Sequence, residues 1–310
     1  MAFVNCAELT SIKLPEAINT IGRKAFQSCS KLQTIILPNA ITSLQQEVFL
    51  GCKSLSSIQI PENVTKIEYA SFTGCSSLKS IFIPKNVNSI SGSAFSTSSI
   101  QEIRIDENNS VYDSRENCNA IIKTSNNTLI FGCSTTTIPN SVTTIDDYAF
   151  SGCSGLADIV IPEGVRSIKY RAFYNCEKLK KLSIASSVTN IGQEAFYNCV
   201  ELKEIYSYIQ TPFALDKSVF NNDNWTTFNI YKVASLFVPH GAQSTYKSTW
   251  YWSLFDKMYE MEEETGIHLG MTEESEVLRY NISGLKMNLV AKGINIVRMS
   301  DGTTKKVVVK

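Results

Sequence analysis

The fold is decided by a short unit that is clearest in residues 48–67, which read VFLGCKSLSSIQIPENVTKI. Within it, Ser57 to Ile60 alternates polar and apolar residues, the pattern of a strand with one buried face. Pro61 ends this strand, because proline has no N–H to donate to a ladder. A second short extended piece follows at 64–67. The Ala-Phe-x-x-Cys stretch that opens each unit predicts one helical turn, with its Phe and Cys facing inward.

The same unit recurs along the chain. An Ala-Phe pair begins at Ala2, Ala25, Ala94, Ala149, Ala172 and Ala195, and Val48-Phe49 and Ser71-Phe72 fill two further positions. Successive Ala-Phe positions are 23 residues apart, except that Ala94 and Ala149 are 55 residues apart. A cysteine follows the Phe by three at Cys6, Cys29, Cys52, Cys75, Cys153, Cys176 and Cys199. Columns that keep one period predict a repeat solenoid.

The size of the unit requires the units to stack. One repeat offers about six apolar side chains, which contribute roughly 10–15 kcal/mol when buried. Ordering its residues costs roughly 35 kcal/mol, at about 1.5 kcal/mol per residue. A single unit therefore does not fold alone, and its neighbours must close the core. We predict a β-rich, right-handed leucine-rich repeat solenoid with short helical turns, followed by a C-terminal cap and a small β appendage.

The nine cysteines predict a buried column rather than a metal site. A zinc site needs four ligands that converge on one point, whereas a ladder places one thiol on each coil. We expect the seven ladder thiols to be small buried hydrophobic groups, with disulfides between adjacent coils as the alternative. Cys118 and Cys133 lie off the ladder and could pair. No metal or other cofactor is expected.

The repeat resembles the BspA-like leucine-rich repeat family of surface proteins from host-associated bacteria. The resemblance covers residues 2 to about 205, and its minor departures are Ser98 in the Cys column and Ala185 in the Pro column. The long unit, 94–148, resembles a hairpin-bearing variant, with two apolar strands joined at Ser125-Asn126-Asn127. The resemblance implies secretion, surface display and recognition or adhesion, and it implies no catalytic residues.

Beyond the repeats, the sequence predicts three further segments. Residues 206–261 are expected to form a degenerate terminal coil and a cap, with an amphipathic helix from Tyr246 to Met261. Residues 262–275 are a candidate linker. Residues 276–310 are expected to form three short strands, the last two joined by a turn at Asp301-Gly302. This tail resembles sorting or anchoring segments of secreted proteins from similar bacteria, and a plain β appendage is the alternative.

Composition and motifs narrow the function. Lys and Arg together number 29, as do Asp and Glu, so no positive surplus favours nucleic acid or an anionic membrane. No apolar run is long enough to span a bilayer, and no secretory signal precedes Ala2, which we interpret as the start of a trimmed fragment. His240 and His268 are the only histidines, and neither lies in a recognisable catalytic arrangement. We therefore predict a non-catalytic protein.

The outward side of the strands is the candidate binding surface. In each strand the residues between the buried Ile positions project outward and should align from coil to coil. The predicted binding column holds Ile36, Gln59, Phe82, Arg104, Val160 and Tyr206, and Lys13 and Ser183 lie in the same column. Exposed apolar side chains among polar neighbours favour a contact face, although strand propensity alone would also place them there.

The predicted function is surface-exposed or secreted binding or adhesion to a host or cell-surface macromolecule, either protein or glycan. One alternative is a structural spacer that self-associates, for instance through the open ends of the solenoid. Another is a carbohydrate-binding accessory protein, for which Trp225, Trp250 and Trp252 would form a platform. We expect an extracellular or cell-surface location.

Overall fold

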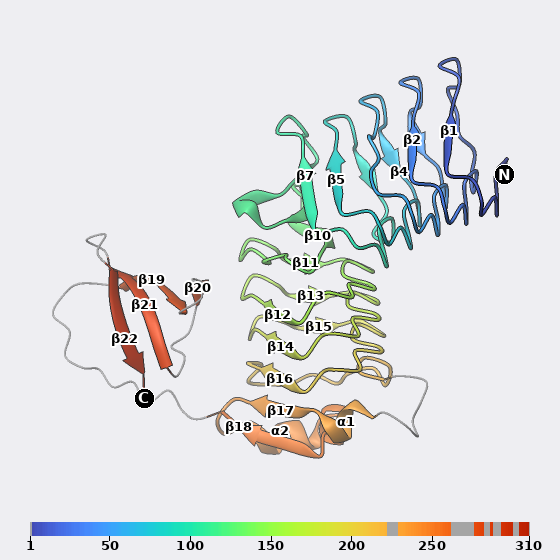
Figure 1. Ribbon diagram of the computed structural model, residues 1–310. Helices are drawn as coiled ribbons and strands as arrows, with labels where there is room; N and C mark the ends of the chain where they lie inside the picture. The colour runs from blue at the N-terminus through green and yellow to red at the C-terminus, as the bar shows by residue number, and fades with distance from the viewer. Residues whose placement is uncertain are drawn as a thin grey trace. The chain divides into compact units, whose positions relative to one another are not determined.

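The computed structural model describes residues 2–221, 229–261, 276–281, 286–287, 293–299 and 304–309. The chain divides into two compact units, Met1–Glu262 and Glu263–Lys310. The first unit is a solenoid of short parallel strands with little helix (Figure 1). The predicted repeat solenoid is confirmed.

Two files of parallel strands run along the solenoid. We call the first ladder the strands that precede the Pro positions: β1 (Ser11–Lys13), β2 (Thr34–Ile36), β5 (Ser80–Ile83), β7 (Glu102–Ile105), β12 (Asp158–Ile161), β14 (Lys181–Ile184), β16 (Glu204–Ser207), β17 (Ser235–Val238) and β18 (Lys257–Glu260). Within β5, Ile81 and Ile83 are buried, whereas Ser80 and Phe82 are exposed. Alternation of the side chains thus gives each strand one core face and one solvent face.

The second ladder follows the Pro positions. It consists of two-residue strands: β3 (Ser43–Leu44), β4 (Lys66–Ile67), β6 (Ser89–Ile90), β11 (Thr144–Ile145), β13 (Ser167–Ile168) and β15 (Asn190–Ile191). Strands β3, β4 and β6 form one sheet, and β11, β13 and β15 belong to another. Each Leu or Ile that ends these strands is buried, so the second ladder, like the first, turns apolar side chains to the interior of the solenoid.

The Ala-Phe segments form consecutive hydrogen-bonded turns, a difference from the expected helical turn. In one coil, Cys29 N donates to Phe26 O at 3.2 Å, but Phe26 N donates to Val48 O of the next coil at 2.9 Å. Lys24 and Ser28 have left-handed backbones, with φ of 62° and 60°. Because the Phe N–H bonds to a neighbouring coil and left-handed residues flank the turn, an α-helical bond pattern cannot continue.

The inner columns stack in register from coil to coil. The Phe3 and Phe26 rings lie 5.2 Å apart, and stacking continues through Phe49, Phe72 and Phe95 and again from Phe150 through Phe173, Phe196 and Phe220. The thiols form a parallel column, in which Cys52 Sγ donates to Phe26 O at 3.1 Å. All nine cysteines are free thiols, including Cys118 and Cys133.

The long unit contributes an antiparallel hairpin. Strands β8 (Tyr112–Asp113), β9 (Ala120–Lys123) and β10 (Thr128–Gly132) pair in sequence, and a 3-10 turn, η1 (Arg115–Asn117), precedes β9. Strand β10 then pairs in parallel with β11, so the hairpin extends the second ladder. The turn between β9 and β10 includes Asn127 with a φ of 53°, which confirms the predicted hairpin turn.

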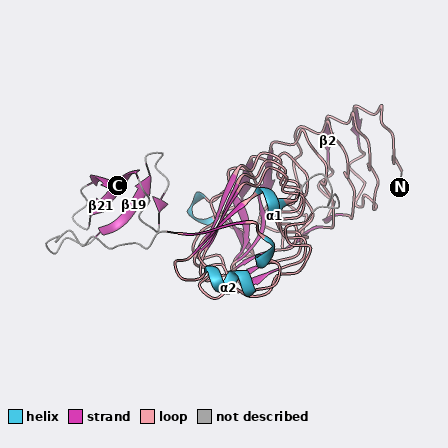
Figure 2. Cartoon of the chain, turned by 90° about the horizontal axis from the view of Figure 1, so that it is seen from below, coloured by secondary structure: helices cyan, strands magenta, loops and turns pink. Residues whose placement is uncertain are grey.

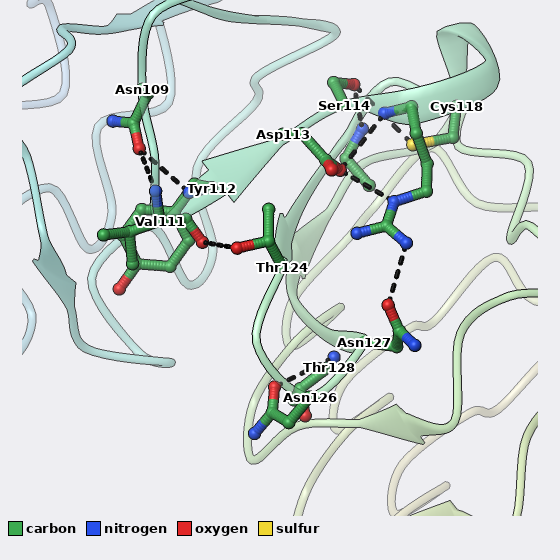
Figure 3. A network of polar contacts seen from close by, with 12 residues as sticks. Asn109, Val111, Tyr112, Asp113, Ser114, Cys118, Thr124, Asn126, Asn127 and Thr128 are labelled. Atoms are coloured by element: carbon green, nitrogen blue, oxygen red, sulfur yellow. Dashed lines mark hydrogen bonds and ion pairs between the residues drawn. The ribbon is translucent and has the colours of Figure 1, made fainter.

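Polar contacts fasten the hairpin to its surroundings (Figure 3). Asn109 Oδ1 accepts hydrogen bonds from the N–H groups of Val111 and Tyr112, each at 2.9 Å. Its Nδ2 donates to Val87 O of the preceding coil at 3.0 Å. Arg115 donates to Asp113 Oδ1 at 2.9 Å and to Asn127 Oδ1 at 2.8 Å, which joins β8 to the hairpin turn. The long unit is therefore anchored to the coil before it.

The hairpin separates two hydrophobic cores. One core runs from Leu14 to Cys133 and the other from Cys118 to Met258. In β9, Ile121 belongs to the first core and Ile122 to the second. In β10, Phe131 packs in the first core and Leu129 in the second. In β9 the side chains alternate across the strand, and in β10 an irregularity between Leu129 and Phe131 breaks the alternation, so the hairpin covers one core with each face.

The end of the first unit differs from the expected single helix. Helix α2 (Gln243–Ser248) is short, Tyr251 has a left-handed φ of 66°, and η2 (Trp252–Leu254) and β18 follow. Strand β18 continues the first ladder after β17 (Figure 1), and helix α1 (Ile230–Val233) precedes β17. Helices α1 and α2 are drawn in cyan in Figure 2. Tyr246 and Trp252 are fully buried, so both side chains pack into the core at this end of the unit.

The second unit is a small antiparallel sheet with the strand order β20-β19-β21-β22. The expected three strands correspond to β19 (Glu276–Asn281), β21 (Gly293–Met299) and β22 (Thr304–Val309), and β20 (Lys286–Met287) is an addition. The predicted linker, 262–275, and the predicted turn at Asp301-Gly302 lie outside the described residues.

Candidate binding surface on the first ladder

The predicted column residues project from the solvent face of the first ladder. Ile36, Phe82 and Val160 are 73%, 44% and 55% exposed, large values for apolar side chains. Register confirms part of the expected alignment: Phe82 pairs with Arg104, and Val160, Ser183 and Tyr206 lie in one row across three strands. Lys13 pairs with Ile36 in the same way, so the structure brings the column residues together in three separate groups.

The column is not continuous, which corrects the single file expected from the sequence. The first ladder is divided into sheets β1-β2, β5-β7 and β12-β14-β16-β17-β18. Gln59 is exposed but lies outside a strand, so no strand ladder joins Ile36 to Phe82. The side chain of Asn119 forms hydrogen bonds with the free edge of strand β7. Its Oδ1 accepts from Ile103 N at 2.7 Å, and its Nδ2 donates to Gln101 O, just before the strand, at 2.7 Å. These side-chain bonds replace those of a following strand.

The sequence reasoning missed two members of the column. Phe237 pairs with Tyr206, and Tyr259 pairs with Phe237. The segment Ser235-Leu236-Phe237-Val238-Pro239 repeats the alternation and the closing proline of the earlier strands, so this signal was available. It was obscured because the step from Tyr206 to Phe237 is 31 residues rather than 23. Tyr259 has no following proline, so only the strand pairing identifies it.

Tyr206, Phe237 and Tyr259 form a stack that we call the aromatic file. The Tyr206 and Phe237 ring centroids lie 4.5 Å apart with an interplanar angle of 9°. Phe237 and Tyr259 lie 5.6 Å apart at 30°. On the other side of Tyr206, Lys181 Nζ lies 4.6 Å from the ring centroid. In-register parallel strands impose this stacking, so Tyr206 and Phe237 turn their edges rather than their faces to solvent, whereas Tyr259 lies on the edge strand β18 and stacks on Phe237 with one face.

Charges around the aromatic file are balanced. Lys181 Nζ lies 3.9 Å from Glu204 Oε2, and the Tyr206 hydroxyl donates to Glu204 Oε2 at 3.2 Å. Partial burial, together with the Glu204 carboxylate, raises the pKa of Tyr206. Its hydroxyl is therefore neutral at physiological pH and remains a hydrogen-bond donor. A shallow hollow beside Phe237 is lined by Leu202, Lys203 and Val233, among others.

The remaining candidates for chemistry are dispersed or buried. Trp250 is 72% exposed, Trp252 is fully buried, and Trp225 lies outside the described residues, so the tryptophans do not form one platform in the part of the chain described. Burial raises the pKa of the Cys52 thiol to about 12, which keeps it protonated. Among the described residues, no three or more His, Cys, Asp or Glu side chains gather into a group able to hold a metal ion. The described part also contains no helix with the length and apolarity needed to cross a membrane.

Sequence comparison agrees with the geometry. The family described as "BspA type Leucine rich repeat region" matches residues 1–121 and 129–237, in six copies. The chain belongs to this family. Curated proteins yield no match.

Solved structures share the fold at low sequence identity. A leucine-rich cell surface protein from Faecalibacterium prausnitzii is 24% identical, with a TM-score of 0.59 over 85% of this chain and 76% of that one. The pneumococcal vaccine antigen PcpA is 17% identical, with a TM-score of 0.55 over 82% and 79%. A leucine-rich repeat protein from Eubacterium ventriosum is 24% identical, with a TM-score of 0.53 over 64% of this chain, which spans 60% of that protein. These likenesses concern the fold alone.

Proposed function

We propose that this protein is a surface-exposed or secreted binding module that captures a macromolecular partner through the first ladder, with the aromatic file at the centre of the contact. The observation that carries the proposal is the row Tyr206–Phe237–Tyr259, in which strand register holds three aromatic rings on the solvent face. Aromatic side chains are frequent anchors of protein interfaces, because they bury a large area at little cost in conformational entropy.

The chemistry of the file favours a protein partner. The faces of Tyr206 are covered by Lys181 and Phe237, so little ring face remains for stacking on a sugar. Exposed ring edges suit apolar side chains and the faces of aromatic rings. The balanced charges nearby favour a partner that also presents both signs. The Faecalibacterium relative is described as a cell surface protein, which supports a similar location here.

The test is a binding screen of the labelled chain against purified extracellular and cell-surface proteins, followed by affinity measurement on the strongest partner. We expect the double variant Tyr206→Ser with Tyr259→Ser to weaken that affinity at least about tenfold, or about 1.4 kcal/mol. Circular dichroism should show an intact fold, because both residues project from the solvent face.

Leu254→Ser is the matched control. Leu254 is 42% exposed and Tyr259 is 49% exposed, but Leu254 does not belong to the first ladder. Affinity should be unchanged in this variant. An unchanged affinity in the Tyr206→Ser, Tyr259→Ser protein would remove the aromatic file from the binding surface, and equal losses in both proteins would show a nonspecific effect.

A further inference from the structure

A second surface lies where the Ala-Phe turns meet solvent, and we call it the turn face. Two positions of each unit lie at this face, some of them largely buried: the residue before the Ala position and the residue after the Phe. The first set is Lys24, Glu47, Ala70, Ser93, Tyr148, Arg171 and Glu194, and the second is Gln27, Leu50, Thr73, Ser96, Ser151, Tyr174 and Tyr197. Backbone bonds such as Thr97 N to Ser151 O, 2.9 Å, hold successive coils together here.

Small side chains in consecutive coils leave a hollow on the turn face. In two consecutive coils both positions are small: Ala70 and Thr73 in one, Ser93 and Ser96 in the next. In the following coil only one of the two positions is small, Ser151. Glu47 and Leu50 line one end of the hollow, and Tyr148 and Tyr174 line the other. Successive coils are about 4.8 Å apart, so the hollow between these two ends is roughly 10–15 Å long. The hollow therefore follows directly from residue size at two columns of the repeat.

Five of the side chains that line this hollow carry a hydroxyl group: Thr73, Ser93, Ser96, Thr97 and Ser151. The Ser96 hydroxyl is buried and has no hydrogen-bond partner among the residues that the structure describes. Each hydroxyl can both donate and accept a hydrogen bond, which matches the hydroxyl groups of a ligand. The floor thus has hydrogen-bonding capacity that the protein leaves partly unused.

Tyrosine rings border the floor. Tyr69 lines the hollow, is 51% exposed, and makes no aromatic contact within the described part of the chain. Tyr148 is held in place by Tyr170, edge to face at 5.5 Å, and by the guanidinium of Arg171, whose Cζ lies 6.0 Å from the ring centroid. The hollow therefore combines a ring that is free to stack with one whose position is fixed.

The charges at the hollow are neutralised within the protein. The Glu47 carboxylate forms two ion pairs: Oε1 lies 3.2 Å from Arg23 Nη2, and Oε2 lies 3.1 Å from Lys24 Nζ. Burial acts to raise the pKa of Glu47, but the hydrogen bonds from Lys24 and Arg23 outweigh it and lower that pKa. Arg171 is paired with Glu194 at 2.7 Å. With these charges satisfied, the surface favours an uncharged ligand.

We propose that this hollow binds one or two rings of a neutral saccharide, with its hydroxyl groups on the serine and threonine floor and its apolar C–H face against Tyr69 or Tyr148. A sugar ring carries hydroxyl groups and an apolar C–H face on one rigid frame. It therefore fits a site that has both hydroxyl-bearing side chains and aromatic rings. The aromatic file lacks this combination, because its rings cover one another. The saccharide site is thus separate from the proposed protein-binding surface and does not depend on it.

The test uses saturation-transfer-difference NMR and calorimetry with three neutral probes, maltotriose, cellotriose and laminaritriose, on the intact chain. At least one probe should bind, with an affinity in the millimolar range or better, about −4 kcal/mol. Tyr69→Ala should weaken binding at least about fivefold. Thr73→Tyr should abolish it by filling the hollow, and the fold accepts this change because Tyr174 and Tyr197 occupy the same position in other coils.

The Tyr206→Ser, Tyr259→Ser protein is the control, and it should retain saccharide binding. Failure of all three probes would overturn the proposal, as would binding that persists in Thr73→Tyr. Binding of anionic but not neutral oligosaccharides would also overturn it. Because the protein-binding test uses different residues and a different partner, each of the two proposals can fail without the other.

Discussion

The solenoid consists of two halves that use the same repeat differently. In the N-terminal half, up to β7, the first ladder is divided into the pairs β1-β2 and β5-β7. In the C-terminal half, β12 to β18 form one sheet of five strands. The Phe columns hardly differ, with spacings of 5.2–5.7 Å in one half and 4.8–5.4 Å in the other. Stacking of the core thus does not require a continuous outer ladder.

The difference shows what each part of the repeat controls. Core columns are apolar in almost every coil, with Ser71 and Ser98 as exceptions, so burial keeps them in register. The outer column mixes charged, polar and apolar residues in the first half, where Phe82 is its one aromatic member, and has consecutive aromatic residues only in the second half. Cross-strand aromatic pairs add to the stability of a sheet. The half with the aromatic file is therefore the half with the unbroken ladder.

The largest expected effect concerns thiol reactivity. With a pKa of about 12, Cys52 is a thiolate in only about one molecule in 10⁴ at pH 8, and iodoacetamide should hardly react with it, whereas the exposed Cys6 should react readily. As urea is added, Cys29 and Cys52 should become reactive before Cys176 and Cys199, because their half has the divided ladder. Mass spectrometry of labelled peptides measures the order. Simultaneous labelling would show that the two halves unfold as one unit.

The next largest effect separates the two faces of the hairpin. Phe131→Ala should lower the free energy of unfolding by about 3–5 kcal/mol, because it opens a cavity beside Phe95, whose ring lies 5.1 Å away. Leu129→Ala should lower the free energy of unfolding by about 2–5 kcal/mol. Hydrogen exchange should rise mainly in 25–105 for the first variant and mainly in 144–205 for the second. The same exchange pattern in both would contradict the division of the core by the hairpin.

A smaller effect should come from the one interruption of the cysteine column. The Ser98 hydroxyl is buried and has no partner among the described residues, whereas Cys75 Sγ, one coil earlier, donates to Phe49 O at 3.3 Å. Ser98→Cys should restore this contact and raise the free energy of unfolding by about 1 kcal/mol. Urea denaturation measures the change. Ser76→Cys, at an exposed position, is the control and should have no effect.

The smallest effect is a pH dependence at Glu47. Its folded-state pKa is lowered, so its contribution to stability is fully present above the unfolded value near 4.3 and is lost as the pH falls through the folded value. Glu47→Gln should therefore cost up to about 1 kcal/mol at pH 7 and progressively less below pH 4. Thermal unfolding from pH 3 to 7 measures this. A cost that does not change with pH would assign the effect to packing instead.

The fold could be predicted from the sequence because the repeat signals act at short range. The Pro after each strand, the alternating Ile residues and the regular Phe and Cys columns each determine a local structure or a buried face. The hairpin turn near Asn127 was found for the same reason. The hydrogen-bond acceptors of the N–H groups in the Ala-Phe turns could not be predicted. Phe26 N donates to Val48 O of another coil, and no local sequence pattern indicates this.

The sequence by itself determined that coils of about 23 residues stack, which residues line the core, and which strand positions face solvent. Only the tertiary structure decided that Asn119 closes β7, that Tyr206, Phe237 and Tyr259 form one stack, and that small residues of neighbouring coils leave a hollow. The reason is physical: burial and strand alternation are properties of a segment and its own side chains. Ladder continuity and surface shape instead depend on which residues of different coils become neighbours.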